Sequence, residues 1–249
     1  MRFLLAALTV VALALTGCGS DDSDGDQTLY VLAAASLTGS FDELAAEFEA
    51  DHDDVKVEAV YDSSATLAQQ VTEGAPADVL ATADLDTMQK VIDAGDAEKA
   101  DTFAGNTAVL VTPKDNPAGI TSFADLDQKE ASYVVCVDTA PCGKVAASLL
   151  QKNSIETEPK SFEDNVKAVL EKVTSGEVDA GIVYVTDAKA AGDAVTVVDI
   201  PGAAEEVTGY GITVVDQSGD AALAQEFVDL VLSDEGQQVL HDAGFAEAP

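Results

Sequence analysis

The sequence predicts an α/β fold with mostly parallel sheets. Apolar segments of strand length alternate with segments of helical spacing along most of the chain. Single helices separate most of the short apolar strands, which is typical of parallel sheets. Ligands on such sheets bind beyond the carboxyl ends of the strands, so the turns that follow the strands are the first places to look for a site.

Eight short apolar segments are expected to form strands, at residues 28–34, 55–61, 78–81, 108–112, 133–137, 180–184, 195–200 and 208–215. Six segments with apolar residues at helical spacing are expected to form helices, at residues 41–50, 67–73, 85–94, 143–152, 165–174 and 221–232. Ser40 and Glu43 have the spacing of a capping box for the first of these helices.

The first residues indicate export. Arg2 precedes an apolar run over residues 3–15, which is too short for a mature membrane span and is typical of a signal peptide. The run ends in Leu-Thr-Gly-Cys at 15–18, which resembles a bacterial lipobox. We therefore expect residues 1–17 to be removed and Cys18 to carry lipid, with a plain secretory signal as the alternative. Residues 18–27 are expected to form the lipid anchor and a solvated acidic tether.

Charge limits the partners of the chain. The formal net charge is -34, and Arg2 is the only arginine, so 46 acidic residues face 11 lysines after export. Such a chain cannot assemble the basic surface that nucleic acid requires. An anionic ligand would be repelled at long range, so N–H and O–H dipoles aimed at close range must hold it.

Two cysteines remain after Cys18. Cys136 and Cys142 lie in an exported domain, where a local disulfide between them is expected and a pair of buried free thiols is the alternative. Their spacing, without further cysteines nearby, does not fit a structural zinc site.

Three turns lead from a strand into a helix and carry small or hydroxyl-bearing residues, at 33–38, 61–67 and 138–143. The N–H groups at a helix start, together with serine hydroxyls, are suited to an anion. Each turn alone is explained by ordinary helix capping. The three together indicate a site for one small anion.

Four ordered motifs carry a family resemblance. They are Ala-Ala-Ala-Ser-Leu-Thr at 33–38, Ser-Ser-Ala-Thr-Leu-Ala at 63–68, Glu-Gly-Ala-Pro-Ala-Asp-Val at 73–79 and Gly-Ile-Val-Tyr at 181–184. Together they resemble the molybdate-binding proteins of ABC importers, from Leu29 to the end of the chain. The resemblance implies a type II periplasmic binding protein fold, in which two crossing strands form a hinge between two lobes. Residues 28–107 and 208–249, including a helix at 233–241, would form one lobe and residues 108–207 the other.

The resemblance also implies the ligand groups. Ser36 and Ser64 would donate through hydroxyl and N–H, Cys142 and Val166 through their backbone N–H, and Tyr184 through its phenol. The family commonly has Ala where this chain has Cys142. Molybdate would be held through its oxygens, without direct metal ligands and without a cofactor. A site with donors only would leave the O–H of a protonated oxyanion unpaired, at a cost of roughly 1–3 kcal/mol.

Two charged residues adjoin these motifs. Asp62 precedes the serine pair and could act as an acceptor, and Lys144 follows the Pro-Cys-Gly turn and could lend charge to the site. Both are expected to face solvent instead, as charged side chains normally do.

The function implied is that of an exported lipoprotein on the outer face of the cell membrane. It would capture molybdate, and tungstate as well, between its lobes and deliver it, as a monomer, to an ABC permease and its ATPase. A receptor for another oxyanion such as sulfate is the alternative. Ser36, Ser64, His52 and His241 also invite a serine hydrolase interpretation, but a G-x-S-x-G elbow is absent.

Overall fold

The computed structural model describes residues 27–128 and 131–249. The expected signal peptide, Cys18 and nearly all of the acidic tether lie outside the described residues. Within the described part, no helix is long and apolar enough to cross a membrane.

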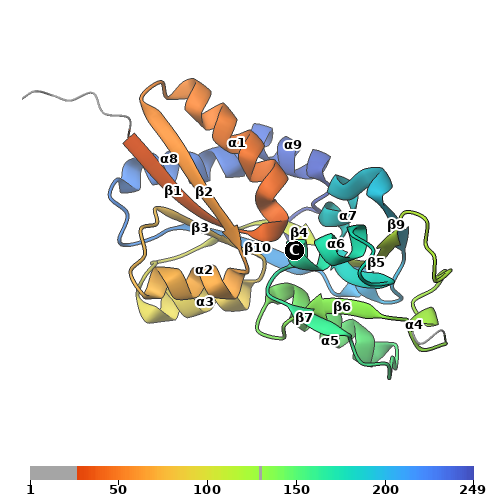
Figure 1. The fold of residues 1–249 in the computed structure, drawn as a ribbon. Helices are drawn as coiled ribbons and strands as arrows, with labels where there is room; N and C mark the ends of the chain where they lie inside the picture. Colours follow the sequence, from red (N-terminus) through yellow and green to blue (C-terminus); the bar gives the residue numbers. More distant parts are fainter. Residues whose placement is uncertain (1–26, 129–130) are drawn as a thin grey trace, which may run out of the picture.

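Ten strands of the described chain form two five-stranded sheets (Figure 1). The first contains β1 (Gln27–Ala34), β2 (Val55–Asp62), β3 (Val79–Thr82), β4 (Asp101–Asn106) and β10 (Thr208–Val214), in the order β2-β1-β3-β10-β4. The second contains β5 (Ala108–Pro113), β6 (Tyr133–Cys136), β7 (Ser161–Glu163), β8 (Ala180–Tyr184) and β9 (Val195–Val198), in the order β7-β6-β8-β5-β9. Each sheet and the helices packed on it are called lobe 1 and lobe 2 below.

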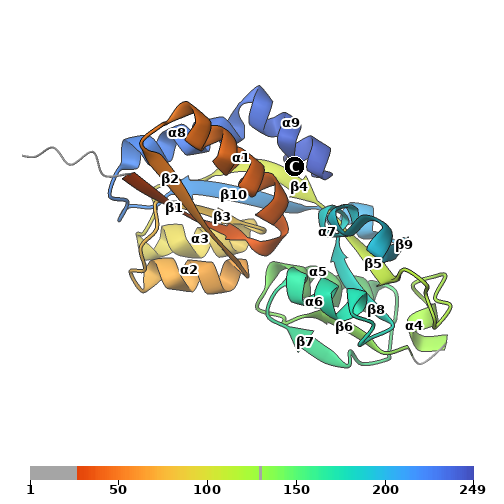
Figure 2. The same ribbon diagram turned by 45° about the horizontal axis from the view of Figure 1, so that its top comes forward.

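Helices cover both faces of each sheet (Figure 2). In lobe 1, one face carries α1 (Thr38–Asp51), α8 (Ala221–Leu232) and α9 (Asp234–Ala243), and the other carries α2 (Ser64–Thr72) and α3 (Leu85–Ala94). In lobe 2, α6 (Val166–Thr174) and α7 (Val185–Ala191) cover one face, and α4 (Asp125–Gln128) and α5 (Pro141–Lys152) the other. Three short 3-10 turns complete the described elements: η1 (Ala35–Leu37), η2 (Gly192–Ala194) and η3 (Ala203–Glu205).

Apolar side chains on both faces of each sheet explain this layering. The largest cluster lies under α1, α8 and α9, where the rings of Phe41 and Phe48 pack on Phe227 with centroids 6.0 and 5.4 Å apart. Burial of such side chains on both faces is the condition under which parallel strands are stable. It also leaves the strand ends as the places where polar groups can gather.

The chain crosses between the lobes twice. It leaves lobe 1 at the end of β4 and enters lobe 2 with β5, one residue later, and it returns between η3 and β10. β5 and β10 are the antiparallel strands of their sheets. β5 and β10 each begin at a crossing, so each runs away from the other lobe. The remaining strands of both sheets run the opposite way and end at the gap between the lobes.

The predicted α/β class is confirmed, and every expected strand and helix is present with ends shifted by at most three residues. The prediction omitted β4, β7, α4 and α7. The capping box is wrong, because α1 begins at Thr38 and the Ser40 hydroxyl, already inside the helix, donates to the carbonyl of Leu37 at 3.1 Å. The division at residues 28–107 with 208–249 and at residues 108–207 stays a prediction.

Candidate functional site

The predicted ligand residues meet in one small cavity of about 20 Å³ between the lobes. Lobe 1 lines it with the ends of β1, β2 and β3, and lobe 2 with the first turns of α5 and α6 and the end of β8. All five residues singled out from the sequence are among its lining: Ser36, Ser64, Cys142, Val166 and Tyr184. The carboxyl ends of strands from both sheets thus converge on the same point.

Ser36 lies in η1, directly after β1, and is 7 % exposed. Its Oγ is 2.7 Å from the hydroxyl oxygen of Tyr210, a fully buried residue of β10. Sequence reasoning did not find this partner, which lies 174 residues further along the chain. The serine hydroxyl is therefore already held in place before any ligand binds.

Ser64 is the first residue of α2 and is fully buried. Its Oγ accepts a hydrogen bond of 2.9 Å from the backbone N–H of Ala83, which follows β3. A backbone N–H can only donate, so the single hydrogen of Ser64 remains for another acceptor. The hydroxyl joins two strand ends and can still donate into the cavity.

The first turn of α5 presents one free donor. Pro141 has no N–H, and the N–H groups of Gly143 and Lys144 donate to the carbonyl of Ala140 at 3.0 and 3.1 Å. Among the described residues, the N–H of Cys142 therefore has no acceptor in this turn. A Cβ at Gly143 would lie 1.9 Å from the carbonyl oxygen of Val137, so only glycine allows this turn to pack so closely.

The predicted disulfide between Cys136 and Cys142 is present, with Cα atoms 5.7 Å apart. It ties the end of β6 to the first turn of α5. The bridge uses the side chain of Cys142 and leaves its N–H to the cavity. Among the described residues, no group of three or more His, Cys, Asp or Glu side chains is placed to hold a metal ion.

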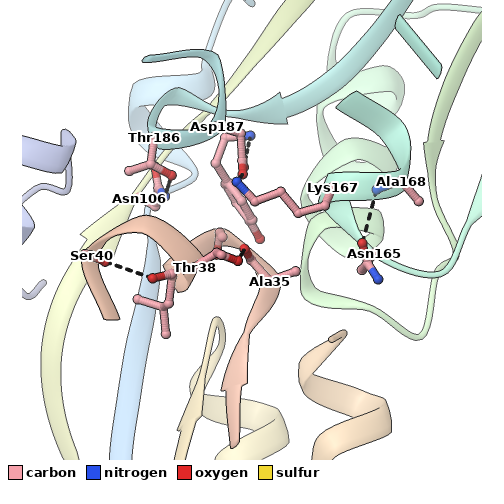
Figure 3. Close-up of polar contacts among 12 residues, drawn as sticks. Ala35, Thr38, Ser40, Asn106, Asn165, Lys167, Ala168, Thr186 and Asp187 are labelled. Carbon is pink, nitrogen blue, oxygen red and sulfur yellow. Dashed lines mark hydrogen bonds and ion pairs between the residues drawn. The ribbon is translucent and has the colours of Figure 1, made fainter. Parts of the chain in front are cut away.

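Val166 opens α6 behind Asn165, whose side-chain oxygen accepts from the N–H of Ala168 at 3.1 Å (Figure 3). This side-chain cap satisfies a later N–H and leaves that of Val166 at the exposed start of the helix. Helix starts such as this one favour anions.

Tyr184 ends β8, and its side chain is 2 % exposed. Its hydroxyl is buried and has no hydrogen-bond partner among the described residues. Burial raises the pKa of this phenol well above its usual value, so it stays protonated and keeps a hydrogen to donate. A buried hydroxyl without a partner costs free energy, so this phenol has a hydrogen bond still to make at the cavity.

Asp187 supports Tyr184 from the first turn of α7. One carboxylate oxygen accepts from the N–H of Tyr184 at 3.3 Å, and the other lies 3.3 Å from the ammonium of Lys167 (Figure 3). Burial raises the pKa of Asp187, and Lys167 opposes that rise. The pair fixes the turn that carries the phenol.

The expectation that Asp62 faces solvent is wrong, whereas Lys144 does not line the cavity and its side chain is 35% exposed. Asp62 lines the cavity, where its Oδ1 accepts from the N–H of Ser63 at 2.7 Å and from the side-chain amide of Asn165 at 2.9 Å. Lys144 is paired with Asp84, with Nζ and Oδ2 2.5 Å apart. The contacts of Asp62 with Asn165 and of Lys144 with Asp84 both join lobe 1 to lobe 2. The two charges find partners because the facing lobe supplies them, which the local sequence does not reveal.

Comparisons with known proteins agree with this arrangement. The profile of the family described as "Bacterial extracellular solute-binding protein" matches residues 29–246. The molybdate-binding protein ModA of Mycobacterium tuberculosis is 38% identical over 251 residues, which cover 98% of this chain and 96% of that protein. YvgL of Bacillus subtilis, named as a candidate substrate-binding lipoprotein of an ABC transporter, is 32% identical, covering 97% and 96%.

Two solved structures share the fold. The periplasmic molybdate-binding protein of Azotobacter vinelandii has a TM-score of 0.75 at 18% identity, covering 89% of this chain and 100% of that one. The sulfate-binding protein SubI of Mycobacterium tuberculosis also has a TM-score of 0.75 at 18% identity, covering 89% and 87%. The architecture is that of the periplasmic binding proteins.

Proposed function

This chain belongs to the bacterial extracellular solute-binding proteins, and we propose that it captures molybdate between its two lobes for an ABC importer. Its relatives are solute-binding proteins and not enzymes, so the serine hydrolase interpretation is abandoned. The polar groups at the cavity are therefore interpreted as groups that bind a ligand and not as groups that catalyse a reaction.

The observation that carries the proposal is the buried hydroxyl of Tyr184 at the cavity, for which the described part of the chain supplies no hydrogen-bond partner. Around the same cavity lie two serine hydroxyls and the N–H groups of Cys142 and Val166, at the starts of two helices. A tetrahedral dianion accepts hydrogen bonds in several directions, and neutral donors and helix ends disperse its charge without a buried cation. This donor set explains how so acidic a chain can hold an anion.

Protonation provides the selectivity in this proposal. Hydrogen phosphate would bring an O–H that needs an acceptor, whereas molybdate is fully deprotonated at neutral pH. Among the described residues that line the cavity, Asp62 is the carboxylate; its Oδ1 accepts two hydrogen bonds, so only its Oδ2 is left to accept from such an O–H. Sulfate is also fully deprotonated, and a sulfate-binding protein shares the fold, so sulfate is the second candidate. The 38% identical molybdate-binding relative favours molybdate, and tungstate should compete because its size and charge are nearly the same.

Closure of the lobes fits capture. Among the described residues, three side-chain polar contacts cross from lobe 1 to lobe 2: Asp84 with Lys144, Asp62 with Asn165, and Asn106 with Thr186. A ligand that bonds to both lobes favours the closed arrangement over an open one by the contacts that it adds. A lipid on Cys18 would keep the monomeric receptor beside its permease and ATPase and raise their effective concentration.

Calorimetric titration of the purified protein with molybdate, tungstate, sulfate and phosphate tests the proposal. We expect molybdate and tungstate to bind with similar dissociation constants, sulfate to bind more weakly and phosphate most weakly. Tighter binding of sulfate than of molybdate would contradict the proposal and support sulfate binding, the second candidate function. Tighter binding of phosphate would contradict the proposed selectivity for fully deprotonated anions.

A further inference from the structure

A chain of buried polar groups lies behind the wall of the cavity. It begins at the backbone N–H of Thr107, which donates to Oδ1 of Asn106 at 3.0 Å. Nδ2 of Asn106 lies 3.3 Å from the hydroxyl oxygen of Tyr210, and that oxygen lies 2.7 Å from Oγ of Ser36. Asn106 and Tyr210 are 1 % and 0 % exposed, and neither lines the cavity.

The first bond of this chain sets the orientation of the amide. A backbone N–H can only donate, so the oxygen of Asn106 has to face Thr107. The amide nitrogen then faces Tyr210 and also Thr186, to whose Oγ1 it donates at 2.9 Å (Figure 3). Both amide hydrogens are used. If the amide were flipped, its NH₂ group would face the N–H of Thr107. Donors would then face donors, and neither the amide hydrogens nor the N–H of Thr107 would have an acceptor.

The direction of the remaining bonds follows. An amide nitrogen has no acceptor, so the oxygen of Tyr210 accepts from Asn106. The phenol has one hydrogen, and burial raises the pKa of Tyr210 above its usual value, so this hydrogen stays in place. If Ser36 donated to Tyr210, the buried phenol hydrogen would have no acceptor among the described residues. The favourable arrangement has Tyr210 donating to Ser36.

We propose that Asn106 and Tyr210 are positioning residues that force the Ser36 hydroxyl to donate into the cavity. Ser36 accepts from Tyr210 behind the wall, so its single hydrogen is directed to the ligand. Ser64 reaches the same state through the N–H of Ala83. Neither serine can then readily turn to accept from a protonated ligand, so the two serines favour fully deprotonated oxyanions and Oδ2 of Asp62 is the carboxylate acceptor left at the cavity. This inference rests on the proposed function and names two residues that determine its specificity.

Substitution Tyr210→Phe tests the inference. The ring that packs against Phe103 and Phe245 is kept, with centroids 6.1 and 5.2 Å away, and only the hydroxyl is lost. Dissociation constants for molybdate and inorganic phosphate are measured at pH 7, and their ratio reports the selectivity. Once Ser36 can turn and accept, we expect the preference for molybdate over phosphate to fall about tenfold, the effect of one hydrogen bond to a charged group.

Two further variants complete the test. Asn106→Asp replaces the amide donor with an acceptor, which reverses the bonds through Tyr210 to Ser36 and should reduce the ratio at least as much. It serves alone if Tyr210→Phe does not fold by circular dichroism. Tyr133→Phe is the matched control, because this buried phenol donates to the carbonyl of Thr157 in lobe 2 and does not line the cavity. It should leave the ratio unchanged.

The outcomes separate the two proposals. One outcome would overturn the positioning role alone. The wild type would prefer molybdate, and Tyr210→Phe and Asn106→Asp would leave the ratio of the two dissociation constants unchanged, even if the affinities for both anions fell. Wild-type protein that binds neither anion, or that prefers phosphate, would overturn the proposed function and the positioning role with it.

Discussion

The two lobes bring different kinds of donor to the same cavity. Lobe 1 supplies hydroxyls that are already bonded: Ser64 accepts from Ala83, and Ser36 is joined to Tyr210. Lobe 2 supplies donors that have no acceptor among the described residues, namely the phenol of Tyr184 and the N–H of Cys142. In lobe 1 the proposed ligand residues also hold strand ends together, whereas in lobe 2 they do not.

The lobes also differ in how they fix their donors. Lobe 1 uses buried hydrogen bonds, and lobe 2 uses covalent and steric restraints, namely the Cys136–Cys142 disulfide and the close approach of Gly143 to Val137. Removing a donor that is hydrogen-bonded within the protein lowers the stability of the fold. Removing a donor that is held by its neighbours and has no partner lowers only the affinity for the ligand. The difference predicts opposite effects on stability for substitutions in the two lobes.

The largest combined effect is expected in lobe 1. Ser64→Ala removes a donor to the anion and leaves the buried N–H of Ala83 unpaired. We expect molybdate affinity to fall on the order of 10- to 100-fold and the free energy of unfolding to fall by about 1–3 kcal/mol. Calorimetry and urea denaturation measure the two quantities.

Ser40→Ala is a suitable control, because this buried hydroxyl of α1 donates to the carbonyl of Leu37 in η1 and does not line the cavity. It should affect stability without affecting affinity. An unchanged unfolding free energy in Ser64→Ala would remove the distinction between the lobes.

The matching substitution in lobe 2 should affect binding alone. Tyr184→Phe deletes a hydroxyl that has no partner among the described residues and keeps the buried ring. We expect molybdate affinity to fall on the order of 10- to 100-fold, from the loss of about 1.5–3 kcal/mol. The melting temperature of the ligand-free protein should stay the same or rise, because a buried unpaired hydroxyl is removed. A lower melting temperature with unchanged affinity would make Tyr184 a structural residue.

The smallest expected effect is the pH dependence that His52 contributes in lobe 1; residues 108–207 contain no histidine. The ring of His52 lies 2.9 Å from the carbonyl oxygen of Phe48 and 3.0 Å from a carboxylate oxygen of Glu226. The hydrogen bond to Phe48, followed by that to Glu226, raises the pKa of His52 above its usual value. The protonated form therefore stabilises the fold below the ordinary histidine pKa, and this contribution is lost as pH rises through the higher pKa of the folded state.

Thermal unfolding between pH 5 and 9 measures this contribution. The melting temperature should fall slightly with rising pH, by an amount limited by the exposure of the ion pair, and His52→Gln should remove that part of the fall. Molybdate affinity should not follow it, because His52 does not line the cavity. An identical profile in His52→Gln would exclude this histidine as the source.

The sequence could predict what depends on local pattern. Apolar alternation located eight strands, and the motif residues Ser36, Ser64 and Tyr184 do lie at one cavity. β4 was missed because Asp-Thr-Phe-Ala-Gly-Asn is too polar and glycine-containing to show a strand pattern. α7 was missed because it is short and directly follows β8.

Contacts between distant segments could not be predicted. Asp62, Lys144 and Asn165 were each visible as polar residues near a motif, but their partners lie on the opposite lobe. Tyr210 stands 174 residues from Ser36, and no spacing rule connects them. The direction of their hydrogen bond depends on Asn106, at the crossing between the lobes. Such features require the folded chain.

The most direct test of a ligand shared by both lobes is a crystal structure of the protein with molybdate, phased to show the anomalous signal of molybdenum. The account predicts a single strong peak in the cavity, with the anion's oxygens within hydrogen-bond distance of Ser36 and Ser64 from lobe 1 and of Cys142, Val166 and Tyr184 from lobe 2. A peak elsewhere, or an anion that contacts one lobe only, would contradict it.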